Sequence, residues 1–221
     1  MLSIVATPIG NLEDMTLRGI RILKEADLIA CEDTRVTGKL IAHFEIPKKK
    51  MVSIHQHSAD KAIDSVIDAL KDGLKVAYAS DAGTPNVNDP GGKLVERAYE
   101  EGIAIEVIPG ASAVSAGISA CGFPMEHYHY VGFIPQKKHR ASTLQRICED
   151  EEASVFFEST HRILKTFEEI SKFIDKGRII YIGRELTKLH ETHYRGTIDE
   201  VLERLQKQSI KGEFVCIIGP K

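Results

Sequence analysis

The sequence contains no tryptophan, and its four cysteines lie far apart with no CxxC pair among them. Widely spaced cysteines inside apolar segments are typical of reduced, buried thiols, so we expect neither disulfides nor a zinc site. No apolar run approaches the length that crosses a bilayer, and the sequence does not open with the basic and apolar segments of a signal peptide. These absences predict a cytoplasmic protein that is not held in a membrane.

Several nucleotide- and metal-binding motifs are also missing. No two of the 17 glycines lie two residues apart, which excludes the GxGxxG fingerprint of dinucleotide-binding folds. Gly92 and Lys93 lack both the earlier glycine and the following Ser/Thr of a phosphate-binding loop. The segment from His190 to His193 is one residue short of HExxH. The sequence therefore disfavours metal-dependent, hydride-transfer and acyl-transfer chemistry.

The charges are almost balanced. There are 29 lysines and arginines against 32 acidic residues, for a net charge of −3. Such a chain has no overall field that would attract nucleic acid or an anionic membrane. A polyanionic partner would have to be bound by local basic clusters.

The first half of the chain alternates short apolar runs with helical patterns. Five apolar runs are expected to be strands, within residues 2–6, 27–32, 51–54, 74–79 and 103–108. Between them, apolar residues recur at helical spacing, for example from Ala62 to Leu70. Continuous apolar strands that alternate with helices predict a largely parallel sheet covered on both faces.

The pattern changes after residue 122. The segment HYHYVGF (127–133) alternates as an antiparallel or edge strand would, and Thr197 with Glu200 forms the capping-box pattern of a helix start. We therefore predict an α/β protein with two domains of similar size, residues 1–122 and 123–221.

Unusual residues concentrate in loops that follow the strands of the first domain. These loops are TPIGNLED (7–14), SDAGTPNVNDPG (80–91) and PGASA (109–113), with EDTR (32–35) as a fourth. In a parallel sheet all of them project from the carboxyl edge, where ligands bind. Glycine allows the backbone close to a ligand, so a shared small-molecule site is expected there. Within 80–91, Asp89 is expected to be the N-cap of the next helix, with Pro90 in its first turn.

The strings TPIGNL, EDTR, SDAGTP, IPGASA, GFIP and ELTK resemble, in this order, motifs of the tetrapyrrole methylase superfamily. Within it the chain is similar to the ribosomal RNA small subunit methyltransferase I family, from about residue 4 to its end. The resemblance implies S-adenosylmethionine as methyl donor, in a cleft between two α/β domains, and usually a homodimer. It also implies 2′-O-methylation of a cytidine in the decoding region of 16S rRNA, with the rRNA or the 30S subunit as partner. The chain departs from common family motifs at Val87, Asn88 and Thr160.

By the same resemblance, three groups of residues are assigned to the site. The cofactor would be lined by Pro8, Gly10, Asp81, Ala82, Gly83, Thr84, Pro85, Gly110, Ala111 and Ser112. The catalytic group would be Asp33, Arg35, Glu185 and Lys188. RNA would be contacted by Lys137, Lys138, Arg140, His161 and Arg162.

A ribose hydroxyl is a poor nucleophile, so a base should help it to lose its proton. Asp33 is the favoured base, with Arg35 orienting phosphate or substrate, and Glu158, Glu185 and Lys188 are rivals. Glu158 and Glu185 end apolar strands, where a carboxylate often serves only to cap or to pair with a nearby arginine.

Two other functions stay open at this point. One is a methylase of a tetrapyrrole or another small molecule, which would not need the basic loop at 137–140. The other is a non-catalytic, cofactor-binding ribosome-assembly factor.

Overall fold

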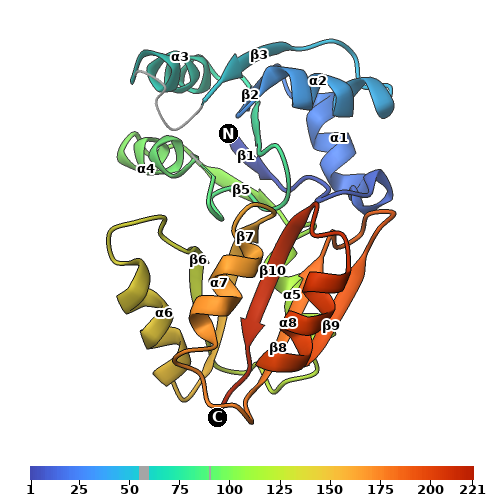
Figure 1. Ribbon diagram of the computed structural model, residues 1–221. Helices are drawn as coiled ribbons and strands as arrows, with labels where there is room; N and C mark the ends of the chain where they lie inside the picture. Colours follow the sequence, from blue (N-terminus) through green and yellow to red (C-terminus); the bar gives the residue numbers. More distant parts are fainter. Residues whose placement is uncertain (55–59, 90) are drawn as a thin grey trace. The chain divides into compact units, whose positions relative to one another are not determined.

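The computed structural model describes residues 1–54, 60–89 and 91–221, and the chain forms two compact units. Unit 1 is Met1–Ser112 and unit 2 is Ala113–Lys221 (Figure 1). The second unit thus begins about ten residues before the predicted boundary at residue 123. The reason is a helix, α5 (Ala113–Cys121), which packs against the sheet of unit 2. Gly117 permits this packing, because a Cβ there would lie 2.6 Å from Cγ1 of Val215.

Unit 1 contains a five-stranded sheet in which every strand pair is parallel, as the sequence predicts. Its order is β3-β2-β4-β1-β5. The strands are β1 (Leu2–Val5), β2 (Leu28–Cys31), β3 (Lys50–Ser53), β4 (Val76–Ala79) and β5 (Ile105–Ile108). The helices of the unit are α1 (Leu17–Glu25), α2 (Thr34–His43), α3 (Asp60–Lys71) and α4 (Gly92–Glu100), with a short 3-10 turn, η1 (Leu12–Asp14).

Both faces of this sheet are covered. On one face, side chains of β1, β2 and β4 pack with Ile63 and Val66 of α3 and Leu94 of α4. On the other, α1 and α2 contribute Leu23 and Leu40 to a second core. Figure 1 shows α3 and α4 on one side of the strands and α1 and α2 on the other. Burial on both faces explains why the strands are continuous apolar runs instead of alternating ones.

Unit 2 contains a mixed sheet in the order β6-β7-β10-β8-β9. The strands are β6 (Tyr128–Phe133), β7 (Ala153–Ser159), β8 (Ile179–Arg184), β9 (Thr192–Thr197) and β10 (Glu213–Ile218). The edge strand β6 was predicted to be an antiparallel or edge strand, and it pairs in parallel with β7. The intervening helix α6 (Arg140–Glu149) makes this possible, since a crossover returns the chain in the same direction. The other pairs are antiparallel.

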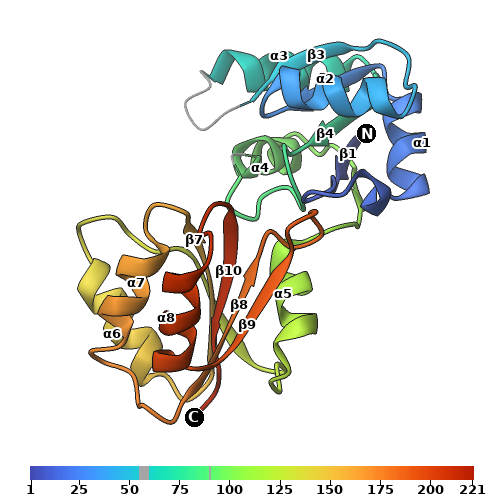
Figure 2. The same ribbon diagram turned by 45° about the vertical axis from the view of Figure 1, so that its right-hand side comes forward.

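Three helices pack on one face of this sheet and α5 on the other (Figure 2). They are α6 (Arg140–Glu149), α7 (Ile163–Ile170) and α8 (Ile198–Lys207). The predicted capping box of α8 is confirmed: the Thr197 and Glu200 side chains each bond the other residue's backbone N–H. The four cysteines are free and buried. Among the described residues, no helix is both long enough and apolar enough to cross a membrane.

Candidate functional site

The loops that follow β1 and β4 are fastened to each other by hydrogen bonds. The amide of Thr7 donates to the carbonyl of Gly83 at 2.9 Å, and the Gly83 amide returns a bond to Thr7 at 3.0 Å. Two buried hydroxyls reinforce this contact. Thr7 Oγ1 donates to the Ser80 carbonyl at 3.1 Å, and Ser80 Oγ donates to the Gly83 carbonyl at 2.8 Å. The sequence placed these loops on one edge, and the structure joins them directly.

The loops after β5 and β2 belong to the same group. Thr84 Oγ1 donates to the Ala111 carbonyl at 3.1 Å. The amide of Asp33 donates to Oδ1 of Asp81 at 3.0 Å. Hydrogen bonds therefore connect all four predicted loops of unit 1, and we call this group the loop cluster (residues 6–14, 31–35, 80–89, 91 and 109–112).

Small residues keep the backbone of the loop cluster open. Gly83 has a φ of +86°, which favours glycine, and a Cβ there would lie 3.2 Å from Cγ2 of Ile9. A Cβ on Gly110 would lie 3.0 Å from the Cβ of Ala6. Among the predicted cofactor residues, Gly10, Ala82 and Gly110 are exposed. The cluster therefore offers backbone groups at its surface, as a small-molecule site requires.

Asp33 and Arg35 form a closed pair within α2 and its cap. Asp33 is the N-cap of the helix and accepts from the Arg35 amide at 2.8 Å. Its carboxylate also accepts from Nε and Nη2 of Arg35, the latter at 2.5 Å. The side-chain bond to Arg35 is the main reason why the pKa of Asp33 is lowered to about 2. A carboxylate held in this way is a weak proton acceptor.

Two other aspartates of the loop cluster, Asp81 and Asp89, have raised instead of lowered pKa values. Burial, together with the charge of Asp33, raises the pKa of Asp81 in spite of the bond from the Asp33 amide. Burial and then the charges of Glu32 and Asp81 raise the pKa of Asp89 to about 7. No group of three or more His, Cys, Asp or Glu side chains in the described chain could hold a metal ion.

The prediction that Asp89 caps α4 is wrong. The helix begins at Gly92, its N-cap is Gly91, and no side chain makes a capping hydrogen bond there. Pro90, expected in the first turn, lies outside the described residues. Helix-cap preference is a local signal, and in the structure Asp89 is partly buried near Glu32 and Asp81 instead.

In unit 2, Glu185 and Lys188 form another closed turn. Oε1 of Glu185 accepts from Lys188 Nζ at 3.0 Å and from the Glu213 amide at 2.9 Å, and Lys188 also contacts Glu213 Oε2 at 2.7 Å. Burial raises the pKa of Glu185, but the Glu213 amide and Lys188 outweigh it, and the pKa is lowered. The structure therefore brings these two predicted residues together, with each charge already compensated.

Glu158 is part of a buried network of hydrogen bonds and ion pairs in unit 2. It is 1% exposed, and its carboxylate accepts from Arg162 Nη2 at 2.8 Å and from Thr166 Oγ1 at 2.7 Å. Arg140 completes this network, because its Nη2 donates to Thr166 Oγ1 at 2.8 Å and its Nε to Glu169 at 2.7 Å. Two of the predicted RNA-binding arginines thus hold the start of α6 and the start of α7 in place.

The other predicted RNA-binding residues are on the surface. Lys137, Lys138 and His161 are exposed. The aromatics Tyr128, Tyr130 and Phe133 are 39%, 40% and 54% exposed. Tyr130 and Phe133 each contact the ring of Phe157 at 5.8 and 5.5 Å between centroids.

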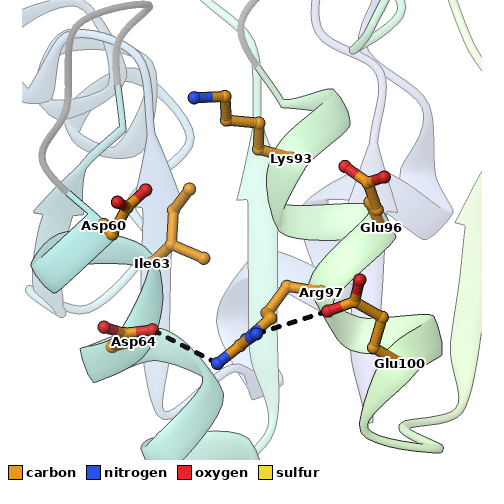
Figure 3. A pocket seen from close by; sticks show the side chains of 7 residues that line it. All are labelled: Asp60, Ile63, Asp64, Lys93, Glu96, Arg97 and Glu100. Atoms are coloured by element: carbon orange, nitrogen blue, oxygen red, sulfur yellow. Dashed lines mark hydrogen bonds and ion pairs between the residues drawn. The ribbon is translucent and has the colours of Figure 1, made fainter.

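A polar groove lies elsewhere on unit 1, between α3 and α4 (Figure 3). Its volume is about 380 Å³, and seven side chains line it: Asp60, Ile63, Asp64, Lys93, Glu96, Arg97 and Glu100. Arg97 spans it through ion pairs to Asp64 at 3.9 Å and Glu100 at 3.3 Å. None of the predicted site residues lines this groove.

Comparison with known proteins places the chain in a family. The model of the tetrapyrrole (corrin/porphyrin) methylases matches residues 1–202. The fold agrees, since diphthine synthase superimposes with a TM-score of 0.77 at 16% identity, covering 100% of this chain and 90% of that one. The chain therefore belongs to the tetrapyrrole methylase family, as its motifs predict, and it is a methyltransferase.

Relatives within this family are much more similar in sequence than diphthine synthase is. The ribosomal RNA small subunit methyltransferase I of Thermotoga maritima is 40% identical over 220 residues, which cover 100% of this chain and 98% of the relative. A more distant structure, uroporphyrin-III C-methyltransferase from Thermus thermophilus, was solved as a complex with S-adenosyl homocysteine. It superimposes with a TM-score of 0.64 at 18% identity over 99% of this chain and 96% of that one.

Proposed function

We propose that this protein transfers a methyl group from S-adenosylmethionine to the 2′-oxygen of a cytidine ribose in the decoding region of 16S rRNA. The observation that carries the proposal is the 40% identity, over the whole chain, to a ribosomal RNA small subunit methyltransferase I. The substrate places the activity in the cytoplasm, and a homodimer is the expected assembly.

The loop cluster has the composition that a methyl donor needs. Exposed backbone at Gly10, Ala82 and Gly110 suits the adenosine and methionine parts of the donor, and Asp81 suits its hydroxyl or ammonium groups. Pro8, Gly83, Thr84, Pro85, Ala111 and Ser112 would complete the walls. When bound, the cofactor supplies an electrophilic methyl group, so the protein has to orient the two reactants and receive one proton.

For the RNA, the exposed residues Lys137, Lys138 and His161 are the proposed phosphate contacts. Arg140 and Arg162 support them by fixing the loop, since Arg162 Nη1 donates to the Ile134 carbonyl at 2.8 Å and Arg140 Nη1 to the Pro135 carbonyl at 3.2 Å. Arg35 and Lys188 are proposed to orient substrate at the turns that they close.

The test is methyl transfer from tritiated S-adenosylmethionine to naked 16S rRNA, to 30S subunits and to a tetrapyrrole, followed by mapping of the labelled nucleotide. The expected result is label on a cytidine 2′-oxygen of the decoding region. Label on the tetrapyrrole alone would replace the proposal with a small-molecule methylase, and label on no acceptor would indicate a cofactor-binding assembly factor.

A further inference from the structure

The loop after β4 ends at Asp89, and one oxygen of its carboxylate has no partner in the described structure. Oδ2 of Asp89 is buried, and no described residue forms a hydrogen bond or an ion pair with it. It does not cap α4, whose N-cap is Gly91. Buried polar atoms almost always have partners, so an exception calls for a functional explanation.

A second unpartnered polar group, the hydroxyl of Tyr78, belongs to a ring that packs against Gly91, two residues after Asp89. Tyr78 of β4 is 0% exposed, and its hydroxyl has no hydrogen-bond partner in the described chain. Burial raises the pKa of this hydroxyl, and the charges of Asp89 and Glu32 raise it further. Gly91 fixes the ring closely, because a Cβ there would lie 2.2 Å from Cε1 of Tyr78.

The charged groups that act on Asp89 are Glu32, at the end of β2, and Asp81, at the start of the loop after β4. Both are acids. By contrast, Asp33 is neutralised by Arg35 and Glu185 by Lys188. Among Asp33, Asp89 and Glu185, Asp89 alone has no cation paired with it in the described structure. Of these three carboxylates it therefore gains most by taking up a proton.

We propose that the carboxylate of Asp89 accepts the proton of the ribose hydroxyl during methyl transfer. This inference rests on the proposed function and names its base. As the bond between the ribose oxygen and the methyl carbon forms, the bond from that carbon to the donor sulfur breaks and its electron pair stays on the sulfur. The hydroxyl proton passes to Asp89, so the positive charge of the sulfonium and the negative charge of the carboxylate disappear together.

The test compares Asp89→Asn with wild type, with Asp33→Asn, and with Asp68→Asn, an exposed acid of α3 that serves as the matched control. General bases contribute about 10²- to 10⁴-fold, so kcat of Asp89→Asn on 30S subunits should fall at least about 100-fold, whereas its Kd for S-adenosylmethionine stays near that of wild type. Asp33→Asn should lose less activity, and Asp68→Asn none. Asp89→Glu should recover part of kcat.

Titration supplies a measurement that does not depend on activity. In the wild-type protein without cofactor or RNA, the carboxyl carbon resonance that is missing from Asp89→Asn should titrate near pH 7. The kcat of wild type should rise with pH through the same midpoint, and Tyr78→Phe, which keeps the ring, should displace that midpoint.

Two failures can be told apart. If wild type labels no RNA, the proposed function has failed. If wild type labels RNA and Asp89→Asn labels it equally well, or if Asp89 titrates at the ordinary value of about 4, only the assignment of the base is overturned.

Discussion

Asp33 and Asp89 both follow strands of the same parallel sheet, in loops of one cluster, but among the described residues only Asp33 of the two has a cation paired with it. The bond to Arg35 lowers the pKa of Asp33 to about 2, whereas burial and neighbouring acids raise that of Asp89 to about 7. Two identical side chains whose surroundings separate their pKa values in this way are suited to different tasks. Asp33 is suited to holding a position with a permanent charge, and Asp89 to exchanging a proton near neutral pH.

The largest expected effect on stability comes from a substitution close to Asp89, at Gly91. In Gly91→Ala the new Cβ would meet Tyr78 at 2.2 Å and Asn86 Oδ1 at 2.4 Å. Overpacking of this kind should lower the free energy of unfolding by about 1–3 kcal/mol, measured by urea denaturation. Gly92→Ala is the control, since a Cβ there would meet nothing within 4 Å. Equal stability of the two variants would mean that the ring of Tyr78 is not held by Gly91.

The two aspartates should affect the pH dependence of stability in opposite directions. The pKa of Asp89 is higher in the folded than in the unfolded state, so its ionisation weakens the fold as pH rises from about 4 to about 7. Asp89→Asn should therefore be more stable than wild type at pH 8, by about 1 kcal/mol after solvent screening, and not at pH 4.

Asp33 has a lowered pKa, so its contribution to the stability of the fold is present above pH 4 and is lost as the pH falls toward 2. Asp33→Asn should accordingly be less stable than wild type at pH 8. Thermal unfolding at the two pH values measures both, and a shift of the same sign in both variants would remove the contrast.

The smallest effect is expected in the groove between α3 and α4. Arg97 forms only surface ion pairs there, and such pairs contribute little. Arg97→Ala should change the free energy of unfolding by no more than about 0.5 kcal/mol and leave methyl transfer unchanged. Loss of methyl transfer in this variant would mean that the active site includes the groove, and would contradict its assignment to the loop cluster.

The sequence predicts the architecture of unit 1 because buried parallel strands leave a pattern that few other structures share. It also predicts the family, since strings such as SDAGTP and EDTR are specific. The position of α5 is not predictable in this way, because the apolar, small-residue pattern of 113–121 does not reveal which sheet the helix contacts. In the structure the helix packs on β10 and β8, with Gly117 close to Val215.

The environment of single charged residues is the other part that the sequence leaves open. Asp89 precedes a proline and a helix, which is the usual pattern of a cap, but burial beside Glu32 and Asp81 depends on strands that are distant in the chain. The same holds for Arg140. It stands in a basic string, yet its guanidinium is buried against Thr166 and Glu169. Tyr78 gives no signal beyond a polar atom within an apolar strand.

The contact between Thr7 and the loop after β4 has a consequence for how the protein folds. Thr7 and Ser80 are 73 residues apart in the sequence, and their hydrogen bond forms only when β1 lies beside β4. Contacts between distant residues require loop closure and therefore form slowly. The helices and the local turns can form earlier in folding, but a chain without the assembled sheet has no loop cluster. Competence to bind a methyl donor is thus acquired at the end of folding, so that cofactor binding during refolding would report the completed sheet of unit 1.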